Sequence, residues 1–156
     1  MADALEIQVA DAVVTEINSQ AWSEVFRAER AYSDIDAELT ELDVLRVEVV
    51  LPEEWDQYDL DTRGSDEAQL TLAIAIRKRF GTEQQNQRLT GALRSEVDRL
   101  YTLAVEMARH FTTRAPTSLE AEWVETTVQH YDRQKLATEQ TFVAVIELQY
   151  NLQRTL

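Results

Sequence analysis

The chain has 156 residues, of which 44% are apolar and 28% are charged, and its formal net charge is −14. This length and composition fit one globular domain with its own core and exclude a disordered chain. The acid excess disfavours binding to nucleic acid or anionic lipid, because both are held mainly by protein cations.

Several site and targeting classes are excluded at the same stage. The chain has no cysteine, so neither a disulfide framework nor a thiolate metal site is expected. No apolar run is long enough to span a bilayer, so no membrane association is expected. The first residues lack the basic start and apolar stretch of a secretory signal, which favours intracellular synthesis.

The N-terminal quarter predicts one helix followed by irregular structure. Apolar residues at helical spacing predict a helix over residues 3–18, with Asp3 and Glu6 as a capping pair at its start. An imperfect alternation over residues 21–32 favours an extended segment. Residues 34–42 are expected to form one helical turn and a loop.

Two strands are predicted in the next part of the chain. Residues 45–51 alternate and are β-branched, which indicates a strand that Pro52 ends. Residues 52–68 hold seven acidic residues and one arginine and are expected to form a long polar connection. Residues 70–77 alternate most clearly, with Leu and Ile on one side, and predict a second strand that Gly81 breaks.

A long helix is predicted from Thr82, with Gln85 as its capping-box partner, to the Ala115–Pro116 pair. Its apolar stripe comprises Leu89, Leu93, Val97, Leu100, Ala104, Met107, Ala108 and Phe111. The cations Arg109, His110 and Arg114 near its end suit the helix dipole.

The C-terminal part predicts a strand over residues 120–128, a polar turn over 132–139 and a final strand over 142–152. In the final strand Phe142, Ala144, Ile146, Leu148, Tyr150 and Leu152 share one face. The order of elements predicts an α+β fold, in which a mostly antiparallel sheet packs against two helices in a single domain, residues 1–156.

Catalytic and cofactor motifs are not found in the sequence. Gly64, Gly81 and Gly91 are too far apart for a phosphate-binding loop. His110 follows Glu106 by four residues, but a zinc-protease helix needs a second histidine there, so a helix-end histidine near solvent is expected. His130 is expected to have a surface or hydrogen-bonding role. No catalytic, cofactor-binding or metal-binding residue is therefore predicted.

One short segment resembles the start of a calcium-binding loop. Asp59, Asp61 and Gly64 occupy suitable places, but Arg63 stands at a ligand position and Leu70 where a bidentate glutamate is required. This departure excludes an EF-hand.

The tryptophans divide into core and interface candidates. Trp123 lies in a predicted strand and is expected to pack, whereas Trp22 suits either a core or an interface. Trp55 and Tyr58 lie in the acidic connection, where one chain would bury them with difficulty. Both residue types are enriched at interfaces, so contact with a partner is expected for them, with folding back onto the domain as the alternative.

The order of segments then becomes informative. A helix over residues 9–18 precedes residues 26–32, the strand 42–50, the end of the next strand at 76–80, the long helix, and the closing strand 142–148. This series resembles the small tail-completion and neck proteins of long-tailed bacteriophages, and in outline the tail terminators. The resemblance covers nearly the whole chain but rests on patterns of residue type. The acidic segment 52–68 and the polar segment 129–140 depart from it.

The resemblance implies a structural virion protein, assembled in the host cytoplasm, and no enzyme. Tail terminators typically form hexameric rings that cap the tail tube and join it to a head-side connector protein, while DNA passes through the lumen without specific binding. An acidic lumen would repel phosphate, and neighbours would cover strand edges such as residues 45–51. Interface candidates are Trp55, Tyr58, Arg46, Glu48, Arg77 and Arg79.

Three alternatives remain at this stage. A head-completion adaptor or stopper would also form a ring on the same axis. A small metal-dependent hydrolase would use Asp59, Asp61 and Glu106, although nothing in the sequence predicts that these residues converge. An acidic DNA mimic would gather carboxylates on one face, whereas the acids here are scattered through all the elements.

Overall fold

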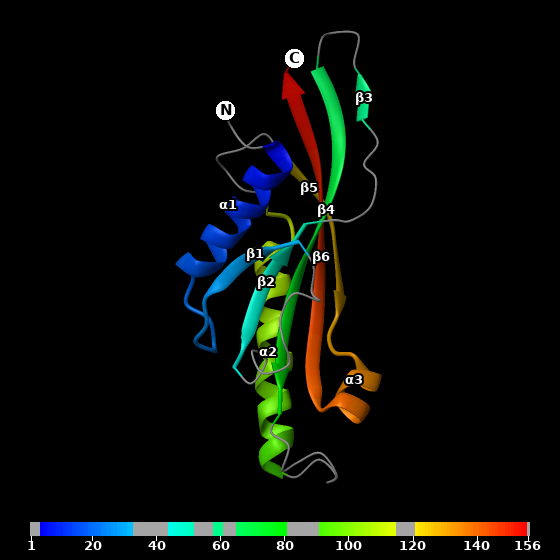
Figure 1. Cartoon of the computed structure of the whole chain (residues 1–156). Coiled ribbons are helices and arrows are strands. Elements are labelled where there is room, and N and C mark those ends of the chain that lie inside the picture. The colour runs from blue at the N-terminus through cyan, green and yellow to red at the C-terminus, as the bar shows by residue number, and fades with distance from the viewer. Residues whose placement is uncertain are drawn as a thin grey trace.

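The computed structural model describes residues 4–32, 44–51, 58–60, 65–80, 91–114 and 121–155. Its elements in chain order are α1 (Leu5–Ser19), β1 (Ala28–Ala31), β2 (Arg46–Val50), β3 (Tyr58–Leu60), β4 (Ser65–Arg79), α2 (Gly91–Phe111), β5 (Ala121–Gln129), α3 (Arg133–Glu139) and β6 (Thr141–Thr155). The predicted α+β class is confirmed (Figure 1).

The sheet has the strand order β1-β2-β4-β6-β5, and β3 pairs with β4 beside this path. Only the β1–β2 pair is parallel among the described strands, so the predicted mostly antiparallel sheet is confirmed. The 15-residue strands β4 and β6 pair along their whole length, from Ser65 with Thr155 to Arg79 with Thr141. They form the centre of the sheet, and β1 and β5 lie at its two edges (Figure 1). The expectation that residues 45–51 form a strand edge is wrong, because β2 is paired on both sides, with β1 and with β4.

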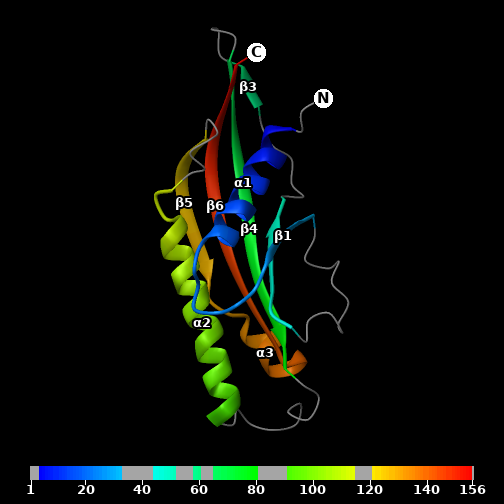
Figure 2. The same ribbon diagram turned by 90° about the vertical axis from the view of Figure 1, so that its left-hand side faces the viewer.

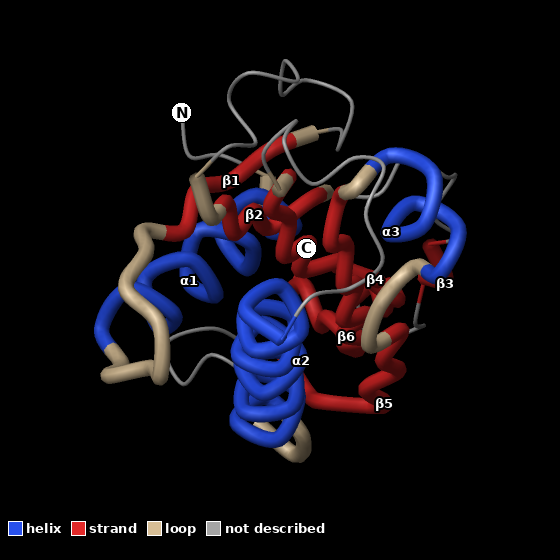
Figure 3. Tube along the Cα trace, turned by 90° about the horizontal axis from the view of Figure 1, so that it is seen from below, coloured by secondary structure: helices blue, strands red, loops and turns tan. Residues whose placement is uncertain are grey.

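The hydrophobic core lies between one face of the sheet and the helices α1 and α2. Figures 2 and 3 show both helices on the same side of the sheet. The strand residues that were predicted to share a face are all buried there: Leu70, Leu72, Ile74, Ile76, Phe142, Ala144, Ile146, Leu148, Tyr150 and Leu152. Period-two alternation in β4 and β6 therefore supplies the apolar floor on which the helices pack.

Helix α1 packs by a four-residue repeat, because Val9, Val13 and Ile17 are all fully buried. The helix begins at Leu5 after Ala4. The Asp3 half of the predicted capping pair lies outside the described residues.

The Asn18 side chain joins the end of α1 to β1. The Ala28 N–H donates to Asn18 Oδ1 at 2.7 Å, and Asn18 Nδ2 donates to the Ala28 carbonyl at 3.1 Å. One amide thus satisfies both backbone groups of Ala28, which fixes the edge strand to the helix.

Helix α2 confirms most of the predicted apolar stripe. Its buried residues include Leu93, Leu100, Ala104, Met107, Ala108 and Phe111, and Val97 packs against them. The predicted start at Thr82, its partner Gln85, and Leu89 lie outside the described residues.

Two predicted connections contain regular structure. The expected polar connection 52–68 is wrong in its second half, because β3 and the first residues of β4 fall within it. The expected turn 132–139 is helix α3, whose Asp132 carboxylate accepts the Lys135 N–H at 3.0 Å and caps the helix.

The expected extended segment 21–32 is a strand only at Ala28–Ala31. The helical turn expected over residues 34–42 lies outside the described residues.

Candidate functional site

The four charged interface candidates of β2 and β4 lie on one face of the sheet. In β2, Arg46 and Glu48 alternate with the core residues Val47 and Val49, so they point away from α1 and α2. In β4, Arg77 and Arg79 alternate with the core residue Ile76 and lie on that same outer face. The register places Arg46 directly opposite Arg77, so the fold brings these side chains together.

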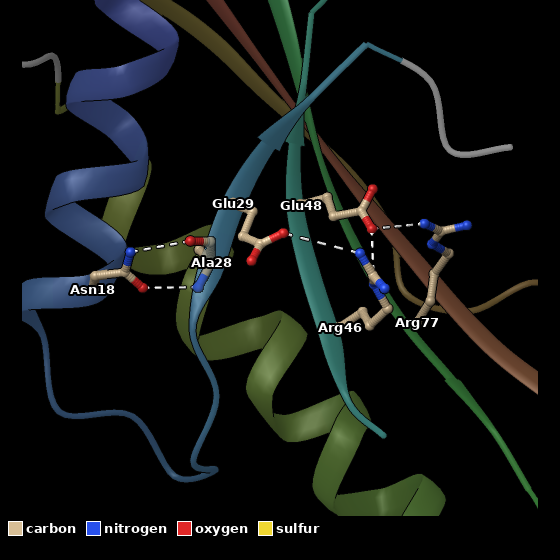
Figure 4. A network of polar contacts seen from close by, with 6 residues as sticks. All are labelled: Asn18, Ala28, Glu29, Arg46, Glu48 and Arg77. Carbon is tan, nitrogen blue, oxygen red and sulfur yellow. Dashed lines mark hydrogen bonds and ion pairs between the residues drawn. The ribbon is translucent and has the colours of Figure 1, made fainter. Parts of the chain in front are cut away.

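The Glu48 carboxylate joins the two arginines (Figure 4). Glu48 Oε1 lies 3.0 Å from Arg46 Nε and 3.0 Å from Arg77 Nη2. Glu29 on β1 approaches Arg46 Nη2 at 4.0 Å and adds a second carboxylate. We call these four residues the ion-pair cluster.

The burial of its side chains indicates the role of the ion-pair cluster. The side chains of Glu48 and Arg77 are only 5% and 6% exposed, whereas that of Glu29 is 67% exposed. A buried charge is tolerated only with a close opposite partner. Glu48 and Arg77 therefore hold β2 against β4 within one chain, and their contact with a partner molecule stays a prediction.

The remaining interface candidates are less well defined by the structure. Tyr58 begins β3 and pairs with Ala68 of β4. Trp55 lies outside the described residues. The interface role of Trp55, Tyr58 and Arg79 likewise stays a prediction.

The outer face changes character toward the other end of β4 and β6. There it carries polar and acidic residues that β4, β6 and β5 present on the side away from the core. They are Gln69, Thr71, Glu122, Glu125, Thr127, Gln129, Glu147, Gln149 and Asn151. We call this surface the acidic sheet face. None of these residues is Lys or Arg, and Glu122, Glu125 and Glu147 are exposed.

Sequence reasoning did not identify the acidic sheet face. The relevant signal was the polar half of each alternating strand, such as Glu147 and Gln149 between the apolar residues of β6. That half becomes one surface only when the strand order and register are known.

A second polar cluster lies where α1 meets α2. His110 Nε2 lies 2.9 Å from Glu16 Oε1, and the Trp22 ring meets the His110 ring edge-on at 5.4 Å. His110 lies in the last turn of α2, as expected, and its side chain is 13% exposed. Trp22 packs against the core, and its Nε1 donates to the Ile17 carbonyl at 2.7 Å.

Tyr150 lies on the core face of β6 near this junction. Its side chain is fully buried, and its hydroxyl has no hydrogen-bond partner among the described residues. Burial, and secondarily the charge of Glu16, raises the pKa of the Tyr150 hydroxyl. The phenol is therefore held in its neutral form.

Trp123 and His130, which the sequence analysis also considered, both make side-chain contacts in the structure. Trp123 packs against the core, as expected, and its Nε1 donates to Thr126 Oγ1 at 2.8 Å. His130 stacks on the ring of Tyr101 at 4.9 Å.

The residues of the hydrolase alternative do not form a common site in the structure. Glu106 lies on α2, and its Oε1 accepts a hydrogen bond from the Ser23 N–H at 3.3 Å. Asp59, in contrast, lies in β3, which pairs with the first residues of β4 at the other end of the molecule (Figure 1). Asp61 lies outside the described residues. In the part of the chain that the structure describes, no three or more His, Asp or Glu residues gather as metal ligands would.

Neither the models of known protein families nor the curated proteins include a match to this chain. None of the helices, as far as the chain is described, is long and apolar enough to cross a membrane.

Proposed function

We propose that the protein is a structural component of a bacteriophage neck, a tail terminator that forms a ring, caps the tail tube and joins it to the head-side connector. The observation that carries the proposal is the acidic sheet face, a strand surface whose exposed glutamates have no Lys or Arg beside them among the side chains that the structure describes. The segment order of the sequence supports the same function.

The acidic sheet face suits the lumen of a ring that DNA crosses. Proteins grip DNA mainly through cations that neutralise phosphates. A surface with three exposed glutamates repels phosphate instead, and the repulsion grows when copies with a net charge of −14 surround one channel. Such a lining lets DNA pass without holding it.

The edges of the sheet suit self-association. Among the described strands, β1 pairs only with β2 and β5 pairs only with β6. Each therefore has one edge that no described strand covers, although on β1 the Asn18 side chain already bonds both backbone groups of Ala28. Natural proteins usually cover or pair such edges. A closed ring with head-to-tail contacts would cover both edges in every copy.

The experiment combines light scattering with binding to particle parts. The purified protein should have the mass of a closed ring and should bind isolated tail tubes that lack their terminal ring. Tubes that already carry their terminal ring serve as the control and should bind none. A protein that stays a single chain and does not bind bare tubes would refute the proposal.

A parallel experiment separates the terminator from the head-completion adaptor or stopper. Isolated head-side portal complexes replace the tail tubes. A terminator should bind the tubes without needing the portal, whereas strong binding to the portal and none to the tubes would favour the adaptor or stopper.

A further inference from the structure

We draw no further inference here: the strongest candidate, the pocket of about 280 Å³ between the α1–β1 connection, the start of β2 and α2, carries none, because its cations Lys78 and Arg99 already pair with Glu96 and Glu24 and nothing in the structure shows what enters it.

Discussion

The charged side chains at the two ends of the outer sheet face differ in burial and in pairing. Strands β4 and β6 run through both ends. At one end, Glu48 and Arg77 are buried and lie 3.0 Å apart. At the other end, Glu122 and Glu147 are exposed, with no cation among the described residues of that surface.

The difference follows from the cost of removing a charge from water. A buried carboxylate or guanidinium must be paired, or it destabilises the fold by several kcal/mol. An exposed carboxylate keeps its hydration and needs no partner, but a group of them repels its own members and any phosphate nearby. The ion-pair cluster therefore serves the stability of one chain, and the acidic sheet face is available for function outside it.

Replacing Glu48 tests the buried end and has the largest expected effect. Glu48→Gln removes the negative charge that lies 3.0 Å from the buried Arg77 guanidinium, and should lower the free energy of unfolding by about 3–5 kcal/mol. Denaturant unfolding measures the change. Glu29→Gln is the matched control, because the Glu29 pair is long and exposed; it should cost less than about 1 kcal/mol. Equal effects of the two substitutions would contradict the contrast between buried and exposed charges.

Replacing Asn18 tests whether the edge strand β1 depends on one uncharged side chain. Asn18→Ala removes the bonds of 2.7 Å and 3.1 Å to the Ala28 backbone. The loss should be about 2 kcal/mol, since two partly buried backbone groups lose their partners. The measurement is denaturant unfolding combined with hydrogen exchange of the β1 amides. Unchanged protection of these amides would contradict the anchoring role.

Replacing Tyr150 compares a buried neutral group with the buried charges. Its pKa is raised in the folded state, so its contribution is fully present below the ordinary tyrosine pKa of about 10 and is lost as the pH rises above it. At pH 11 the wild-type protein should have lost roughly 1 kcal/mol that Tyr150→Phe retains, because the unfolded chain ionises there and the folded one does not.

Unfolding at pH 7 and pH 11 measures this difference. At pH 7, Tyr150→Phe should be nearly neutral, since the hydroxyl has no hydrogen-bond partner among the described residues. Identical pH profiles for the two proteins would show that Tyr150 ionises as readily in the folded chain.

Neutralising the acidic sheet face should have the smallest effect on stability. Glu122, Glu125 and Glu147 are exposed, so changing all three to Gln should alter the free energy of unfolding by less than about 0.5 kcal/mol. The same variant should bind double-stranded DNA measurably better at low salt, and the gain should vanish as salt is added. A large loss of stability would show that these residues stabilise the fold, as the ion-pair cluster does.

The sequence predicted those parts of the fold in which a local pattern dominates. The alternation in β4 and β6 and the four-residue repeat in α1 specify their buried faces directly. Helix α3 was missed because residues 132–139 are mostly polar; the signal was Asp132 as a cap, together with Leu136, which packs against the core. The first residues of β4 were missed because they are acidic, and they are extended because β3 and β6 pair with them.

The arrangement of the charged residues was harder to predict from the sequence than the strands and helices, because it depends on tertiary structure. Arg77 and Arg79 are similar in sequence context, and only the register of β2 with β4 places Glu48 beside Arg77. The acidic sheet face likewise combines residues of β4, β5 and β6, which are far apart in the chain. The bonding of His110 to Glu16 joins residues 94 positions apart, which no local pattern indicates.

The position of the acidic sheet face in the assembly is the central claim, and a single-site label tests it most directly. The chain has no cysteine, so Glu147→Cys provides a unique thiol on this face for a small gold cluster, and Thr15→Cys provides one on α1, on the opposite side of the sheet. In electron micrographs of rings viewed along their axis, the label at position 147 should lie at the central opening and the label at position 15 farther out. A label at position 147 on the outer rim would contradict the account.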